Sequence, residues 1–218
     1  MGKSFKDIRE HLAALDQAGK LVKIDRAINK DTELMPLVRW QFRGLPESQR
    51  KAFLFTNVVD VTGRKYDMPV VVACLAASRE IYALGLGCPV EQISQKWMES
   101  EKNPIEPRLI DRGPVQEVVH LGEDLLSHEG LGEFPLPIST PGFDNGPYTT
   151  SSHWFTQDPD TGILNIGNYR GQIKSPLRMG IALSSRNHGG IHWSKCRAKG
   201  IPLQAALVVG APPAVAYT

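Results

Sequence analysis

The second half of the chain contains a run of polar residues whose spacing suits the binding of an anion. In the run NIGNYR, alternation along a strand places Asn165, Gly167 and Tyr169 on one face, and Asn168 and Arg170 on the other. An arginine can hold a carboxylate or a phosphate through two parallel hydrogen bonds. The amide oxygen of an asparagine suits a hard divalent cation. The run therefore indicates a site for a carboxylate, a phosphate or a metal–phosphate group.

A second polar stretch follows the next predicted strand, Leu177 to Leu183. Ser184 comes directly after this strand, and Asn187 and His188 precede two glycines. Polar side chains and glycines at the end of a strand are typical of loops that bind anions or metal–phosphate groups. An imidazole nitrogen is in addition a common metal ligand. The two stretches together form the predicted functional site.

Each of these side chains also has an ordinary structural explanation. Taken alone, Arg170 would more often be one half of a surface or interface ion pair. Asn165 taken alone would more often form hydrogen bonds at a turn or a strand edge, and a lone histidine is more often structural. By composition, His153 and His192 are candidates equal to His188. The residues by themselves leave these alternatives open.

The two stretches resemble the UbiD family of prenylated-FMN-dependent decarboxylases. The resemblance rests on the run N-x-G-x-Y-R, on Asn187-His188 before paired glycines, on the turn Asp158 to Gly162, and on the lead-in Pro147 to Thr150. It extends to the first predicted helix and to the segment ASREIYALGLG. It thus covers nearly all of this chain, but only part of the length that is usual in the family.

The resemblance implies a role for each residue of the predicted site. Arg170 matches the arginine of the family's Arg-Glu-Glu catalytic set, and Asn165 and His188 match its two early metal ligands. The implied cofactors are prenylated FMN and Mn²⁺, with K⁺ as an additional candidate ion. The residues implied to contact the flavin are Asn165, Asn168, Tyr169, Arg170, Leu183, Ser184, Asn187 and His188.

The implied reaction is the reversible, non-oxidative decarboxylation of an aromatic or α,β-unsaturated carboxylic acid, with CO₂ as the other small partner. A hydroxybenzoate-type acid is the expected substrate. The family's third metal ligand and both catalytic glutamates would lie beyond Thr218, so we expect the 218-residue chain to be inactive alone. We expect a homo-oligomer, or a partner chain that supplies the C-terminal part. The alternative is a non-catalytic cofactor-binding or assembly subunit of a multi-chain carboxylase or decarboxylase.

The elements that precede the site alternate between helices and strands, which predicts an α/β layer architecture. A proline-rich, charged stretch over residues 102–114 indicates a boundary between an N-terminal α/β domain, residues 1–113, and a second domain, residues 114–218. The helices of the first domain are predicted to begin at Ser4, Asp31, Ser78 and Val90, and its strands to span Leu21–Ile24, Ala52–Phe55, Val58–Val61 and Pro69–Ala73.

Strands predominate in the second domain, around a long irregular stretch over residues 130–147. The predicted strands are Val115–Leu121, Tyr148–Phe155, Ile163–Arg170, Leu177–Leu183 and Leu203–Val209, and a helix is predicted over His188–Lys199. The resemblance implies that this domain is the first part of a split β-barrel that binds the flavin and is incomplete in this chain.

Composition argues against several classes of partner. The formal net charge is only +2, and no long run of lysine and arginine indicates binding of nucleic acid. Three widely spaced cysteines are consistent with free thiols in a reducing cytosol. The N-terminus has no apolar signal region, and no stretch is long enough to span a membrane. We therefore expect a cytoplasmic protein that binds neither nucleic acid nor membrane.

Overall fold

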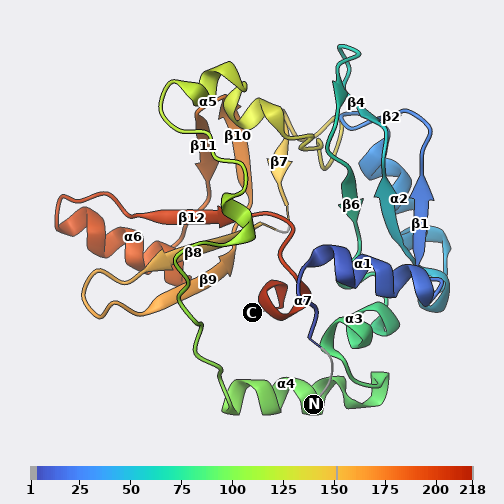
Figure 1. Ribbon diagram of the computed structural model, residues 1–218, viewed down its shortest axis with the longest axis horizontal. Coiled ribbons are helices and arrows are strands. Elements are labelled where there is room, and N and C mark those ends of the chain that lie inside the picture. The colour runs from blue at the N-terminus through green and yellow to red at the C-terminus, as the bar shows by residue number, and fades with distance from the viewer. Residues whose placement is uncertain (1–3, 151, 218) are drawn as a thin grey trace.

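A computed structural model describes residues 4–150 and 152–217 of the chain; residues 1–3, Ser151 and Thr218 lie outside the described part. Figure 1 shows two lobes joined by a long connector. We call residues 4–102 the N-terminal lobe, residues 103–146 the connector, and residues 147–210 the C-terminal lobe. The described residues form a mixed α/β structure with four three-stranded sheets. None of these sheets closes into a barrel within the described part, so the split barrel stays a prediction.

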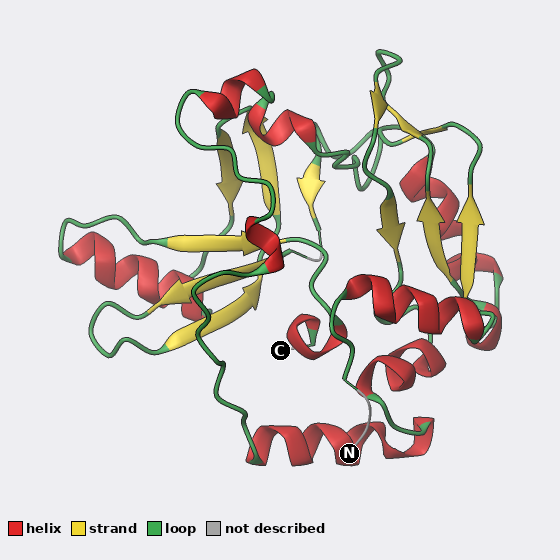
Figure 2. Cartoon of the chain, in the orientation of Figure 1, coloured by secondary structure: helices red, strands yellow, loops and turns green. Residues whose placement is uncertain are grey.

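The helices are distributed over both lobes and the connector (Figure 2). The α-helices are α1 Ile8–Gln17, α2 Leu34–Gly44, α3 Arg79–Leu86, α4 Ile93–Lys102, α5 Asp124–Ser127, α6 His188–Ala198 and α7 Pro213–Ala216. The 3₁₀ helices are η1 Glu47–Gln49, η2 Val90–Gln92, η3 Pro114–Gln116 and η4 Gly130–Glu133. Among the described residues, no helix has the length and apolar character needed to cross a membrane.

The strands are short, and each belongs to one of the four sheets. Those of the N-terminal lobe are β1 Leu21–Ile24, β2 Ile28–Asn29, β3 Ala52–Phe55, β4 Val58–Val59, β5 Lys65–Tyr66 and β6 Val70–Val72. Those of the C-terminal lobe are β7 Tyr148–Thr149, β8 His153–Gln157, β9 Leu164–Asn168, β10 Gly171–Ser175, β11 Arg178–Ile181 and β12 Ala205–Val208.

The N-terminal lobe has helices on both faces of the sheet β1-β3-β6. Ala52 of β3 packs with Leu15 of α1 and Ile81 of α3, whereas Phe55 of the same strand packs with Val38 of α2. An odd separation along a strand places two side chains on opposite faces, so β3 is covered on both sides. The predicted α/β layers are therefore present in this lobe.

Three predicted helix starts have different outcomes. Ser78 caps α3 as predicted, because its hydroxyl accepts a hydrogen bond from the Ile81 amide at 3.3 Å. The prediction that the first helix begins at Ser4 was wrong, because the Asp7 side chain caps α1 by accepting a hydrogen bond from the Glu10 amide at 2.9 Å. The prediction that the second helix begins at Asp31 was also wrong. Helix α2 begins later, and the Asp31 carboxylate forms a buried ion pair with Lys30 at 2.7 Å.

The strands predicted after residue 113 differ from those observed in three places, two in the C-terminal lobe and one in the connector. The predicted strand Tyr148–Phe155 is divided into β7 and β8, which belong to different sheets. The predicted strand Ile163–Arg170 ends at Asn168, and the unexpected strand β10 follows it. Val115–Leu121 is not a strand, because no neighbouring strand pairs with it and Val115 is 88% exposed.

The end of the described chain returns to the N-terminal lobe, where α7 packs against α3 (Figure 1). The Tyr217 hydroxyl donates a hydrogen bond to the Leu75 carbonyl at 2.6 Å. Its ring meets the Tyr82 ring edge-on, with centroids 4.6 Å apart. On the other side, an imidazole nitrogen of His153 lies 3.3 Å from the Ala216 carbonyl. These contacts join the two lobes.

We expect His11 to make the stability of the fold depend on pH. Its side chain is fully buried, with Nε2 2.8 Å from the Cys74 carbonyl. Burial lowers the pKa of His11 below its ordinary value of 6.5, although the hydrogen bond to Cys74 acts in the opposite direction. The unfolded chain therefore binds a proton first as the pH falls below about 6.5, and the free energy of unfolding decreases.

Urea denaturation at pH 7 and pH 5 measures this effect. His11→Gln should reduce the loss of stability between the two pH values, whereas the exposed His188→Gln should leave it unchanged. An equal pH dependence in wild type and His11→Gln would show that His11 is not the responsible group.

Candidate functional site

The side chain of Tyr169 occupies the centre of the predicted site, between β9 and the start of α6. A Cβ atom at Gly167 would lie 2.5 Å from the tyrosine ring, and one at Gly189 would lie 2.8 Å from it. The Gly189 amide donates a hydrogen bond to the Tyr169 hydroxyl at 3.0 Å. Glycine at both positions lets the ring occupy its observed place, whereas a Cβ atom at either position would require the ring to shift.

Asn165 lies beside the same hydroxyl. Its amide nitrogen is 3.5 Å from the Tyr169 hydroxyl and 3.4 Å from Thr156 Oγ1, to which it also donates. Thr156 of β8 is the direct cross-strand partner of Asn165 in β9. Because both bonds use the amide nitrogen, the carbonyl oxygen of Asn165 is the atom that a cation can use.

A buried polar chain continues beneath Asn165 toward the turn before β9. Thr156 Oγ1 lies 3.0 Å from Nδ1 of His192, a buried residue of α6. The other ring nitrogen of His192 is 3.8 Å from the Asp158 carboxylate, which accepts a hydrogen bond from Lys195 at 2.6 Å. That bond is the largest contribution that lowers the pKa of Asp158, to about 2. The turn is thus tied to α6 by an ionised carboxylate.

Sequence reasoning missed the contribution of Thr156 to this group. The residue carries no motif of its own, and only the pairing of β8 with β9 brings it opposite Asn165. His192 was named as an alternative to His188, and its burial beside Thr156 makes it a supporting residue beneath Asn165.

The loop before α6 is held tightly against the end of β11. The Asn187 side chain caps α6 by accepting from the Gly190 amide at 2.8 Å, and it donates to the Ser184 hydroxyl at 3.2 Å. A Cβ atom at Gly190 would lie only 1.9 Å from the Ser184 carbonyl oxygen. His188, the first residue of α6, is exposed beside this loop. The Gly189 and Gly190 amides are thus already bound by Tyr169 and Asn187, but the positive end of the helix dipole still favours an anion at this point.

Arg170 points to a different set of partners. Its guanidinium lies 3.3 Å from both carboxylate oxygens of Asp144 and 4.1 Å from the centroid of the Tyr148 ring. Its side chain is 54% exposed. The structure thus contains the ion pair that was the ordinary explanation of this residue, and its role toward a substrate stays a prediction.

Two further predicted flavin contacts flank the central group. Asn168 is exposed at the end of β9, where it is paired in register with His153 of β8. Leu183 is half-buried two residues after the end of β11. The structure therefore brings together Asn165, Tyr169 and the start of α6, while Asn168 and Arg170 lie outside this hydrogen-bonded group.

Comparison with known proteins identifies the family of both lobes. Residues 12–101 match the N-terminal domain of 3-octaprenyl-4-hydroxybenzoate carboxy-lyase, and residues 108–218 match its Rift-related domain. The phenolic acid decarboxylase of Sedimentibacter hydroxybenzoicus is 27% identical over 231 residues, which cover all of this chain and 45% of that protein.

Two solved structures have the same fold. One is HmfF from Pelotomaculum thermopropionicum, an evolved dimeric form of a UbiD-class enzyme in complex with prFMN. It is 30% identical to this chain with a TM-score of 0.79, and the match covers 96% of this chain and 45% of the HmfF chain. The other is the apo 3,4-dihydroxybenzoic acid decarboxylase from Enterobacter cloacae, which is 26% identical with a TM-score of 0.83. The match covers 97% of this chain and 44% of the decarboxylase chain.

This chain therefore spans less than half the length of each of these three relatives. The two matched domains leave few of its residues outside the family's sequence pattern. The chain belongs to the UbiD family of carboxy-lyases.

Proposed function

We propose that this chain forms the flavin-binding part of a decarboxylase that acts on an aromatic or α,β-unsaturated carboxylic acid. Its family membership and the carboxy-lyase activity in the names of its relatives support a decarboxylation. One observation carries the assignment to this site: Asn165 and the start of α6 meet at the Tyr169 hydroxyl. A metal ligand and an anion-binding helix start are thereby brought side by side.

The donor atoms at this point fit a metal–flavin phosphate group. The carbonyl oxygen of Asn165 and the imidazole of His188 match the mixed oxygen and nitrogen preference of a Mn²⁺-type ion. Ser184, Asn187 and the positive end of the α6 dipole would favour the phosphate, with the Gly189 and Gly190 amides exchanging their present acceptors for it. Prenylated FMN, when bound, supplies an acceptor for the electron pair that decarboxylation releases. The protein residues bind and orient the flavin and the acid, and exclude water.

Arg170 would hold the carboxylate of the acid through its planar fork of donors. For this, the substrate carboxylate must replace Asp144 as its partner. Arg170 is 54% exposed, whereas the Asp144 side chain is 15% exposed and would keep a hydrogen bond from the Thr140 amide at 2.9 Å after the exchange. Asp144 would therefore keep Arg170 in position until the substrate binds.

We further propose that the division at residue 113 separates an α/β domain from the first part of a split barrel. We expect the substrate to be a hydroxybenzoate-type acid and the reaction to run as decarboxylation or as carboxylation. The expected location of the protein is the cytoplasm. The rest of the active site would come from further chain, from a second copy or from a partner chain. The alternative is that the chain is a non-catalytic cofactor-binding or assembly subunit of a multi-chain carboxylase or decarboxylase. The intact mass of the native protein distinguishes such a subunit from a part of a longer enzyme chain.

Reconstitution tests the proposed function directly. The native protein is loaded with prenylated FMN and Mn²⁺, and exchange of labelled CO₂ into a panel of aromatic and unsaturated acids is measured. We expect exchange into at least one acid, dependent on the prenylated cofactor. Equal exchange with ordinary FMN, or none in native protein that carries the prenylated flavin, would contradict the proposal. We expect no exchange from residues 1–218 alone.

We expect Asn165→Ala and His188→Ala to weaken the binding of Mn²⁺ in the presence of flavin, with little effect on the fold. Each change removes one metal donor, and His188 is exposed. Metal content and thermal melting are measured side by side. Asn103→Ala is a matched control, since it removes an exposed amide that has no proposed role in the site. Unchanged Mn²⁺ content together with a large loss of melting temperature would make the two residues structural.

A further inference from the structure

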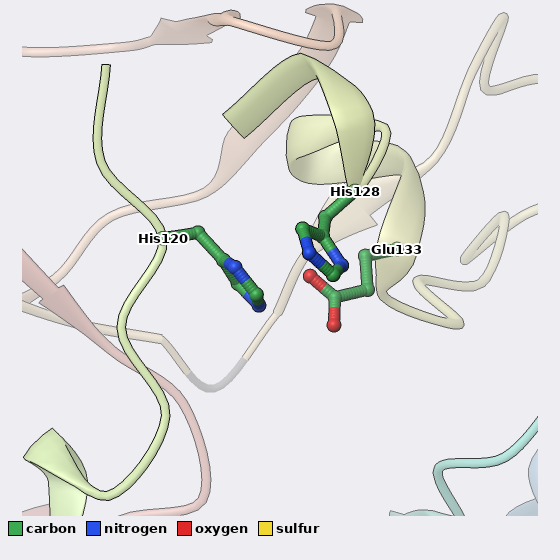
Figure 3. A group of neighbouring side chains, drawn as sticks. All are labelled: His120, His128 and Glu133. Atoms are coloured by element: carbon green, nitrogen blue, oxygen red, sulfur yellow. The ribbon is translucent and has the colours of Figure 1, made fainter. Parts of the chain in front are cut away.

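The connector contains a group of metal-ligating side chains that the proposed function does not use. Figure 3 shows His120, His128 and Glu133 facing one another. One ligand atom from each residue, a ring nitrogen or a carboxylate oxygen, lies within 4.8 Å of the others. His120 precedes α5, His128 directly follows it, and Glu133 ends η4. We call these three residues the connector cluster.

A carboxylate beside the connector cluster orients its histidines. Asp124 Oδ2 lies 2.8 Å from Nδ1 of His120, and Asp124 Oδ1 lies 3.6 Å from Nε2 of His128. The two rings are stacked, with centroids 3.7 Å apart. In metal sites, a histidine commonly donates one ring N–H to a carboxylate and binds the metal through the other nitrogen. Asp124 holds His120 in this way, with Nε2 left as the ligand atom.

The backbone between His128 and Glu133 is shaped to turn the glutamate back toward the histidines. Glu129 and Gly130 both have left-handed conformations, with φ of 62° and 54°. A Cβ atom at Gly130 would lie 2.3 Å from the Pro176 carbonyl oxygen, which also accepts a hydrogen bond from the Leu131 amide at 2.8 Å. An ion pair with Arg64 holds the side chain of Glu129. The left-handed conformation is strained for Glu129, which has a side chain, and such strain persists only where the surroundings impose it.

The chemistry of the connector cluster selects one class of metal. Two imidazoles and one carboxylate are a ligand set for Zn²⁺ and similar ions, whereas Mg²⁺ and Ca²⁺ prefer oxygen throughout. With metal–ligand distances of about 2.0–2.2 Å, tetrahedral ligand atoms lie roughly 3.4 Å apart. The cluster, within 4.8 Å, therefore needs only side-chain adjustment to close around an ion.

We propose that His120, His128 and Glu133 bind a zinc-class divalent cation, with Asp124 as the positioning residue. The ion would join the segment before α5 to η4, and so fix the connector against the hairpin of β10 and β11. This site shares no residue with the Asn165–His188 group and requires no flavin. A negative result for this metal site would therefore leave the proposed function unaffected, and the reverse also holds.

Cobalt titration of the flavin-free, full-length protein tests this site, because tetrahedral Co²⁺ has visible absorption bands that report ligand geometry. We expect one equivalent of Co²⁺ to bind with tetrahedral bands, and Zn²⁺ to displace it. His128→Ala and Glu133→Gln should abolish these bands. Asp124→Asn should weaken Co²⁺ binding about 10–100-fold, as loss of a group that orients a ligand does.

Two controls separate the connector cluster from other metal ligands. Asn165→Ala combined with His188→Ala should leave the cobalt bands unchanged, and so should Glu123→Gln, which changes a neighbouring exposed carboxylate. Thermal melting in EDTA shows whether each variant is folded. If His128→Ala is not folded, the near-isosteric variants Asp124→Asn and Glu133→Gln test the site in its place. The proposal is overturned if wild type binds no Co²⁺, if the folded cluster variants bind it with wild-type affinity, or if the Asn165–His188 double variant loses the bands.

Discussion

Gly190→Ala is expected to destabilise the chain and to abolish flavin binding. The added methyl group would lie 1.9 Å from the Ser184 carbonyl oxygen, 2.6 Å from its carbon and 2.9 Å from the Ser184 nitrogen. All three atoms are backbone, so no side-chain rotation relieves the overlap. Forcing an extra methyl into a packed site costs about 1–3 kcal/mol, which exceeds the gain of about 1 kcal/mol when alanine replaces glycine in a helix. The loop before α6 must therefore move away.

The free energy of unfolding in urea and the affinity for FMN, measured by flavin fluorescence, report the two effects of Gly190→Ala. Gly44→Ala at the end of α2 is the matched control, because a Cβ atom there would meet nothing within 4 Å. We expect Gly44→Ala to leave the FMN affinity unchanged and to raise the free energy of unfolding by no more than about 1 kcal/mol. Wild-type FMN affinity in a folded Gly190→Ala protein would mean that this loop does not hold the flavin.

Arg170→Lys is expected to reduce turnover about 100-fold in the catalytically competent protein, while the flavin stays bound. Lysine keeps the positive charge but loses the planar pair of donors that orients a carboxylate. Displacement of a reacting group by about 1 Å can cost on the order of 100-fold in rate. The flavin should be retained because Asn165 and the start of α6, which would hold its phosphate, do not involve Arg170.

Turnover on a good substrate and cofactor occupancy from the absorbance spectrum are measured on the same Arg170→Lys preparation. Arg178→Lys, the same change at an exposed position of β11, is the control and should behave as wild type. Wild-type turnover by Arg170→Lys would show that a simple ion pair is sufficient. Loss of the flavin would instead make Arg170 chiefly a cofactor residue.

The elements with strong local signals could be predicted from the sequence. Ser78 caps α3 as predicted, and the helix predicted over His188–Lys199 spans His188–Ala198, because an N-cap side chain binds an amide only three residues away. The apolar run Ala52–Phe55 forms β3 as predicted. Val115–Leu121 contains Gln116, Glu117 and His120 among its apolar residues and has no partner strand, and an isolated strand leaves its backbone groups unpaired. Strand pairing is not a local property.

For the candidate site, the residue types and their spacing could be read from the sequence, whereas the need for glycine at certain positions becomes visible only in the structure. The spacing of Gly167, Tyr169 and Gly189 follows from the room that one tyrosine ring needs. Only the tertiary structure decided that Thr156 supports Asn165 and that Asp144 holds Arg170. It also decided that His120, His128 and Glu133 meet, a group that the sequence analysis did not single out. These contacts depend on strand register and on the path of the connector, which are set by burial across the whole fold rather than by neighbouring residues.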